Sequence, residues 1–529
     1  MNTAGPRVLR KRFGWLVLAL GVSGTGAQGQ LRQVGYIKAS APHANDHFGN
    51  GGALEGHALA MSGDRATMAV GAPYESSAAR GVNGKQDDTS LYSAGAVYVY
   101  TRRNNVWTQQ AYLKASNPGQ SFRFGHMVAL SQDGNTLAVA SHFEASAAKG
   151  VNGNQDDRSI PQAGALYVFT RTGGTWRQEA YLKASNTGEP GVGKEPPEGD
   201  QFGFSIALSA DGNTIAAGSI SEDSAAAGVN GNQADNSKQS SGAAYVFVRN
   251  GGVWTQQAYI KASNPEPNTL FGYSVGLSAD GNTLAVSSYD EAGSARTING
   301  PQDRGRRGSG AVYVFARTAQ TWAQSAYLKA ANADQGDSMG YEIAISNDGN
   351  TIAAGAADED CLNPGVNPAG CVDDFRSDTS AGAVYVFSRN PRGQWTQQAY
   401  LKASNPGHEN WFGARLALSG DGDSLAAGSQ VENGAAKGIN GNQKDQSAED
   451  AGALYLFTRS AGTWSQKAYV KASNAEAYDE FGSSMALSRD GKLLVVGARG
   501  EASAAKGANG SQEDNSAPGA GAVYVFTSQ

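Results

Sequence analysis

Short apolar runs alternate with glycine-rich polar loops along the chain. In residues 124–185 the apolar positions fall into four runs, at 125–131, 136–141, 164–171 and 176–185. Each run has the length of a β-strand and is bounded by turn residues. Asp133-Gly134 suits a tight hairpin between the first two runs, because glycine adopts positive φ at little cost. With no 3.6-residue apolar period, the unit is predicted to be a four-stranded antiparallel meander.

This unit recurs seven times. Each copy has an aspartate in its first turn: Asp64, Asp133, Asp211, Asp280, Asp348, Asp421 and Asp490. A sheet with two apolar faces must be covered on both sides, and copies arranged around an axis cover one another. The pattern therefore predicts an all-β fold, a seven-bladed β-propeller of four-stranded antiparallel blades.

The two ends of the repeat array complement each other. Residues 31–40 (LRQVGYIKAS) match the last strand of a copy, such as WTQQAYLKAS at 107–116, whereas the final copy ends at residue 526 with three strands. We expect the N-terminal strand to complete the seventh blade and to remove the open edges of the array. Residues 31–529 are thus predicted to form a single propeller domain.

Residues 1–30 read as a signal peptide. Four basic residues precede an apolar run at 14–22 that is too short to span a bilayer, and small residues follow it. We expect an exported protein, periplasmic or at the cell surface, with no membrane span after cleavage. Cys361 and Cys371 are then predicted to form a disulfide bond. The formal net charge of −6 argues against a nucleic-acid partner.

A long polar loop follows the second strand of every copy. It begins near a glutamate: Glu75, Glu144, Glu222, Glu291, Glu359, Glu432 and Glu501. Most copies add an aspartate further along: Asp88, Asp157, Asp235, Asp445 and Asp514. Two interpretations remain open. The acids hold their own loops together, or they bind calcium through oxygen ligands. In the calcium-binding interpretation, the metal ligands are Glu75, Asp88, Glu144, Asp157, Glu222, Asp235, Glu432, Asp445, Glu501 and Asp514.

The last strand of each copy carries a lysine: Lys38, Lys114, Lys183, Lys261, Lys329, Lys402 and Lys471. This strand should be the exposed outer edge of its blade. A lysine on an exposed edge discourages pairing with the edge of another molecule. We therefore interpret these lysines as edge protection.

Residues that do not repeat are the better candidates for ligand contacts. Copy one has an insertion that separates Phe48-Gly49 from His57. The loop of copy four has Arg304, Arg306 and Arg307 in place of the acidic pattern, and copy six has Trp411 before Phe412. We take His57, the three arginines and Trp411 as candidate ligand-binding residues.

The signature FGxSxALSxDGNTLAVGA…AGAVYVF resembles the FG-GAP repeats of bacterial exported proteins, and it is more distantly similar to the integrin α propeller. The resemblance covers about residues 31–527 and implies a seven-bladed propeller with a role in adhesion or partner binding. Integrin-type calcium blades carry a DxDxDG loop between the first two strands. Here the turn is only Asp133-Gly134-Asn135 and its equivalents, so those calcium sites are not carried over.

No catalytic motif is present: there is no HExxH, no GxSxG and no P-loop. The sequence favours a non-catalytic binding or adhesion module, with a protein or carbohydrate ligand on the long-loop face. The alternative is a carbohydrate-active enzyme, a lyase or hydrolase, built from residues of different blades that converge near the axis. Calcium is the one candidate cofactor.

Overall fold

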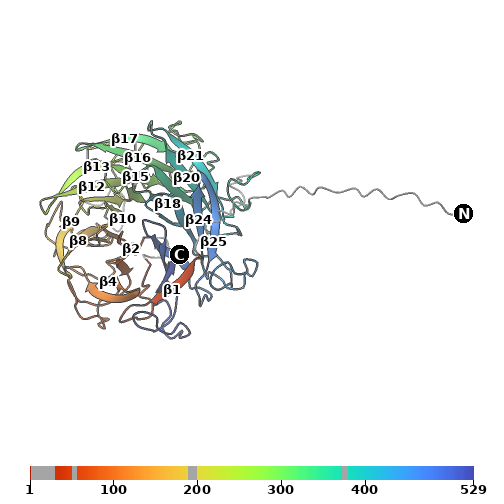
Figure 1. The fold of residues 1–529 in the computed structure, drawn as a ribbon. Helices are drawn as coiled ribbons and strands as arrows, with labels where there is room; N and C mark the ends of the chain where they lie inside the picture. Colours follow the sequence, from red (N-terminus) through yellow and green to blue (C-terminus); the bar gives the residue numbers. More distant parts are fainter. Residues whose placement is uncertain (2–29, 51–55, 189–198, 372–378, 529) are drawn as a thin grey trace.

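The computed structural model describes residues 1, 30–50, 56–188, 199–371 and 379–528. Residues 2–29 of the predicted signal peptide lie outside the described residues. The described chain forms seven antiparallel four-stranded sheets in a ring (Figure 1). This confirms the predicted seven-bladed propeller. Within these residues, no helix is long and apolar enough to cross a membrane.

The first four blades follow the chain in order. Blade 1 contains β2 (Leu59–Met61), β3 (Thr67–Ala72), β4 (Ala96–Arg103) and β5 (Val106–Leu113). Blade 2 contains β6 (Val128–Leu130), β7 (Thr136–Ser141), β8 (Ala165–Thr172) and β9 (Thr175–Leu182). Blade 3 contains β10 (Phe202–Leu208), β11 (Thr214–Ser219), β12 (Ala243–Asn250) and β13 (Val253–Ile260). Blade 4 contains β14 (Val275–Leu277), β15 (Thr283–Ser288), β16 (Ala311–Thr318) and β17 (Thr321–Leu328).

The remaining three blades complete the ring. Blade 5 contains β18 (Met339–Ile345), β19 (Thr351–Ala356), β20 (Ala383–Arg389) and β21 (Trp395–Leu401). Blade 6 contains β22 (Arg415–Leu418), β23 (Ser424–Ser429), β24 (Ala453–Ser460) and β25 (Thr463–Val470). Blade 7 contains β26 (Phe481–Leu487), β27 (Leu493–Ala498), β28 (Ala522–Thr527) and the N-terminal strand β1 (Arg32–Ile37).

The ring closes through β1. This strand pairs antiparallel with β28, with Gln33 opposite Phe526 and Ile37 opposite Val523. It supplies the outer strand of blade 7, in agreement with the sequence prediction. The seventh blade therefore joins the two ends of the chain, and no blade is left with three strands.

The core lies between neighbouring blades. Val97 and Val99 of β4 pack in one buried cluster with Tyr167 and Phe169 of β8. Second strands such as β7 are buried along their whole length, because the two neighbouring blades cover the two faces of each blade. Each fully buried large apolar side chain contributes about 1.5–3 kcal/mol. The stacking of blades is therefore the main source of stability.

A Phe-Gly pair lies at the entry into six of the blades, and Met339-Gly340 takes its place in blade 5. Phe124 packs edge-on against Tyr167, with ring centroids 5.3 Å apart. Gly125 has φ +93°, and an added Cβ would lie 2.5 Å from the Ala96 carbonyl oxygen, so no larger residue fits. In blade 1 the same position is filled by Phe48, which is fully buried. The predicted insertion after Phe48-Gly49 is thus confirmed, although residues 51–55 within it lie outside the described part.

The tight hairpins between first and second strands gather at one end of the axis. Their backbones form hydrogen bonds 2.8–2.9 Å long across six of the seven blade junctions. These bonds run from the N–H of Gly63, Gln132, Ala210, Ala279, Asn347 and Gly420 to the carbonyl oxygens of Gln132, Ala210, Ala279, Asn347, Gly420 and Arg489, respectively. The long loops and the connections between blades emerge at the opposite end, which is the face available for a site.

Candidate functional site

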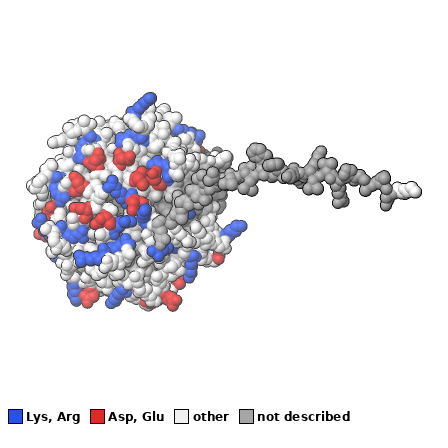
Figure 2. Space-filling view, viewed as in Figure 1, with Lys and Arg blue, Asp and Glu red and all other residues white. Residues whose placement is uncertain are grey.

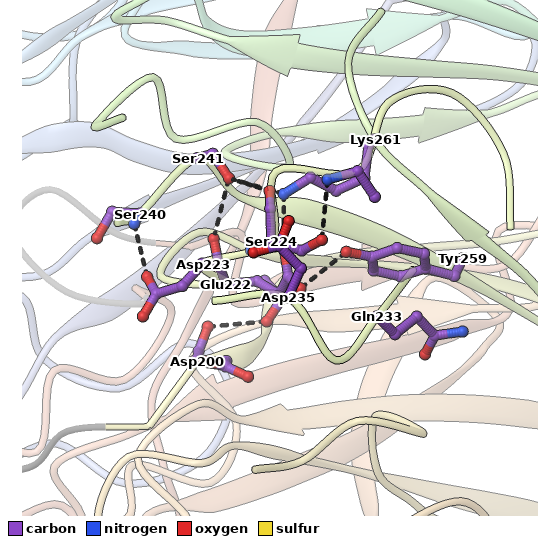
Figure 3. Close-up of polar contacts among 12 residues, drawn as sticks. Asp200, Glu222, Asp223, Ser224, Gln233, Asp235, Ser240, Ser241, Tyr259 and Lys261 are labelled. Atoms are coloured by element: carbon purple, nitrogen blue, oxygen red, sulfur yellow. Dashed lines mark hydrogen bonds and ion pairs between the residues drawn. The ribbon is translucent and has the colours of Figure 1, made fainter. Parts of the chain in front are cut away.

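The repeated glutamates and lysines form one buried node in each blade. In blade 3, Lys261 Nζ donates to Glu222 Oε2 at 2.6 Å and to Ser241 Oγ at 2.8 Å (Figure 3). The other carboxylate oxygen of Glu222 accepts from the Tyr259 hydroxyl at 2.8 Å and from Asn186 Nδ2 at 3.1 Å. Asn186 belongs to the connection from blade 2, so the node also joins neighbouring blades.

The same ion pair recurs around the ring. Both side chains are 0–2 % exposed in every copy, and the Nζ–Oε2 distance is 2.6–3.0 Å in six of them. The pairs are Lys114–Glu75, Lys183–Glu144, Lys261–Glu222, Lys329–Glu291, Lys402–Glu359, Lys471–Glu432 and Lys38–Glu501. Burial lowers the pKa of Lys261, and the charge of Glu222 acts against that shift.

The edge-protection interpretation of the lysines was therefore wrong. Their strand is the outer one, but its last residues are buried under the long loop of the same blade, as the 0 % exposure of Lys261 shows. The loop folds back over the end of the strand because its glutamate binds the lysine. A charge buried in this way requires a partner.

The predicted metal ligands take two different places. The glutamates lie in the buried nodes, where lysine, tyrosine and asparagine donors surround their carboxylates. The aspartates cap their own loops: Asp157 accepts from the backbone N–H groups of Ala147 and Ser159, at 3.3 and 2.8 Å. No cluster of three His, Cys, Asp or Glu side chains suited to a metal occurs among the described residues. Calcium binding by the loops stays a prediction.

The other predicted ligand residues are dispersed. Arg304 pairs with Glu266, and both line a cavity of about 440 Å³ together with Arg307. Arg306 donates to the Ser294 carbonyl oxygen at 2.9 Å. Trp411 is half-buried.

The predicted disulfide is present. Cys361 and Cys371 are bonded, with their Cα atoms 5.3 Å apart.

His57 lies in a different setting, at the long-loop end of the axis. The innermost strands of adjacent blades contact one another there. The residue that follows the glycine at the entry to each blade, or its counterpart in blade 1, lies in or close to the innermost strand. It is one of five residue types in the seven blades: His57, His126, Phe204, Tyr273, Tyr341, Ala414 and Ser483. The next position also varies, with Glu342 in blade 5 and Arg415 in blade 6.

Aromatic rings form a continuous arc through blades 2 to 5. Successive ring centroids lie 3.8, 5.9, 5.1 and 5.4 Å apart along the series His126, His142, Phe204, Tyr273 and Tyr341. Tyr289, which follows β15, lies 4.3 Å from Tyr273. Burial lowers the pKa of His126 well below its usual range, so this imidazole is neutral.

A histidine and a glutamate complete the ring. His57 Nε2 lies 3.1 Å from Glu342 Oε2, a contact that joins blade 1 to blade 5 across the axis. Ser274 of blade 4 donates to the other oxygen of Glu342 at 3.1 Å. We call the following group of residues the axial site: His57, Phe204, Tyr273, Tyr341, Glu342 and Arg415. Only His57 of these was singled out from the sequence. Comparing the seven copies column by column would have revealed the rest, because the axial positions differ where the framework repeats.

One family model and two solved structures are similar to the chain. The model of the FG-GAP repeat family matches residues 254–315 and 464–526. No curated protein matches the chain. Hydrazine synthase from Kuenenia stuttgartiensis is 12% identical over 87% of this chain and 94% of its own, with a TM-score of 0.42. The periplasmic gluconolactonase PpgL of Pseudomonas aeruginosa is 14% identical over 85% of this chain and 98% of its own, with a TM-score of 0.45. The chain therefore carries FG-GAP repeats at two places, in a ring of blades that closes into a seven-bladed propeller.

Proposed function

We propose that the protein is an exported binding module that holds its ligand at the axial site. One observation carries this proposal: the side chains that do not repeat converge from different blades on one place. His57, Tyr273 and Glu342 come from blades 1, 4 and 5. A framework needs no such variation, whereas a site for one ligand does. The disulfide is consistent with export to an oxidising compartment.

The repeated polar residues have a structural role. Glu222 and Lys261 bind each other, and Arg249 stacks on Trp254 while its guanidinium bonds Thr136 and Glu179 of the preceding blade. These groups hold blades together and are not free for a ligand. Figure 2 shows basic and acidic residues interspersed over this view of the molecule, without a large area of one sign. Recognition by a specific site is therefore favoured over broad electrostatic attachment.

The composition of the axial site favours a carbohydrate or a polar peptide segment. Tyrosine offers an apolar ring face and a hydroxyl group, and both can contact such a ligand. Tyr273, Tyr289 and Tyr341 are each half-exposed or less, so their rings are held in place by neighbours. A site of this kind binds with little loss of side-chain entropy.

The test compares Tyr273→Ala/Tyr341→Ala with the wild-type protein on immobilised polysaccharides and matrix proteins. The matched control is Tyr478→Ala, because Tyr478 is 56% exposed in the connection between blades 6 and 7. We expect the axial double variant to lose binding to at least one of these ligands and the control to keep it. Unchanged binding of every ligand by the double variant would refute the axial site.

A carbohydrate-active enzyme is the second candidate. The observation in its favour is the His57–Glu342 pair, which places an imidazole and a carboxylate 3.1 Å apart beside the tyrosines. Such a pair can carry a proton to or from a substrate. Incubation with the polysaccharides that bind, followed by an assay of reducing ends, separates the candidates. Turnover that disappears in His57→Ala supports the enzyme, and binding without turnover supports the module.

A further inference from the structure

Arg415 is a buried cation in the axial site. It opens β22 and is 2% exposed. Its Nε donates to the Ser483 carbonyl oxygen at 3.1 Å, and its Nη1 donates to the Ala414 carbonyl oxygen at 2.8 Å. Nη2 is buried and has no hydrogen-bond partner in the described chain. Since guanidinium has five N–H donors, the side chain is held in a fixed direction with donors left over.

Among the residues that the structure describes, no carboxylate forms a direct ion pair with Arg415. The charge of Glu480 acts on it, but Glu480 lies 2.5 Å from Arg499 and is already paired there. A buried charge without a directly bonded counter-ion is costly, whereas every repeated lysine of this ring has one.

Strand β22, which begins at Arg415, packs beside β18, which carries Tyr341 of the aromatic arc. Burial raises the pKa of Tyr273 well above its usual range, and the charge of Arg415 acts in the opposite direction, although Tyr273 belongs to blade 4 and Arg415 to blade 6. An anion bound to Arg415 would therefore lie beside the tyrosine rings. The carboxylate of Glu480 opposes such an anion less, because Arg499 is paired with it.

We propose that Arg415 binds the carboxylate of a sugar acid whose ring packs on Tyr273 and Tyr341. This proposal rests on the proposed function and names the ligand class. A uronic acid has the two features that the site can recognise, an apolar ring face for the tyrosines and a carboxylate for the unsatisfied Nη2. Arginine is the residue best suited to a carboxylate, through its planar set of donors.

The experiment measures binding of paired probes to the intact mature protein by titration calorimetry. Each pair is a uronate oligosaccharide and its methyl ester, which keep the same ring and differ in the carboxylate charge. Galacturonate, glucuronate and mannuronate oligomers provide three pairs, and acetate provides the carboxylate alone. We expect at least one free acid to bind about tenfold more tightly than its ester. In Arg415→Gln this preference should vanish, while Arg415→Lys should retain part of it.

Each outcome decides the matter. Equal affinity for acid and ester in every pair, or no binding of any pair, overturns the sugar-acid proposal. Acetate that binds as tightly as the oligomers would overturn the role of the tyrosines. If Arg415→Gln does not fold, the preference of the wild-type protein and the Arg415→Lys variant still test the proposal. Loss of polysaccharide binding in Tyr273→Ala/Tyr341→Ala without any acid preference would keep the axial site and reject only the sugar acid.

Discussion

Replacing one lysine of the repeated nodes tests how the ring is held together. Lys261→Met removes the partner of Glu222 and leaves the carboxylate buried beside Tyr259. Breaking a buried ion pair in this way costs about 3–5 kcal/mol, since the remaining charge has lost its counter-ion. The methionine keeps the apolar stem, so the loss reports the charge and not a cavity.

The loss can be expressed as a change in melting temperature. At about 2.1 cal/mol/K per residue, unfolding of a ring of about 500 residues has an entropy of about 1 kcal/mol/K. If the ring unfolds as one unit, Lys261→Met should lower Tm by about 3–5 °C. Scanning calorimetry measures both Tm and the enthalpy that verifies the cooperative unit.

Two controls make the result specific. Lys238→Met removes a pair with Glu266 whose side chains are 29% and 23% exposed, and it should cost under about 1 kcal/mol. The double variant Lys261→Met/Glu222→Gln leaves no unpaired charge and should recover much of the loss. A Lys261→Met variant as stable as Lys238→Met would refute the role of the node. Self-association at unchanged stability would instead support edge protection.

Three further predictions follow from the described contacts. Replacing Cys361 and Cys371 by serine should cost about 2–3 kcal/mol through the unfolded chain, seen as a lower Tm, and an unchanged Tm would contradict it. EGTA should leave Tm unchanged, because the loop glutamates bind lysines; a fall of several degrees that calcium reverses would restore the metal interpretation. Burial raises the pKa of Asp479 to about 7, so the folded state holds a proton that the unfolded state releases near pH 4. Stability from this group is present at low pH and is lost as pH rises to about 7, and Asp479→Asn should abolish that fall in denaturant titrations.

The architecture could be predicted because short-range patterns in the sequence determine it. Short apolar runs without a helical period, an aspartate in each first turn and a missing fourth strand in the last copy determine the strands, their order and the closure by β1. Even the insertion in blade 1 was visible, since Phe48-Gly49 kept its two residue types while its spacing changed. Local signals and the ring geometry agree, so few alternatives remained.

The lysine node was missed because burial is a property of the loop and not of the strand. An outer strand is exposed unless something covers it, and a polar loop gives no sign of covering anything. One signal in the sequence did point to the pairing of the glutamate with the lysine. The glutamate and the lysine are 39 residues apart in blades 1, 2, 3 and 6, although a surface loop tolerates changes in length; blades 4 and 5 depart from this, with 38 and 43 residues. A spacing that recurs between two charges of opposite sign indicates that both ends are held.

The axial site shows why the sites of repeat proteins are hard to find from the repeat. His57 and Glu342 are separated by nearly the whole of four blades along the chain, yet their side chains are 3.1 Å apart. Only the axis brings every blade within reach of the others, so side chains of the innermost strands are the ones that can combine. Residues such as Glu222 and Lys261 must repeat, because every blade needs the same support. Residues such as Tyr273 and Arg415 are free to differ, because the ring does not depend on their identity. The positions that differ between the seven copies are therefore the ones to consider as candidates for a binding site.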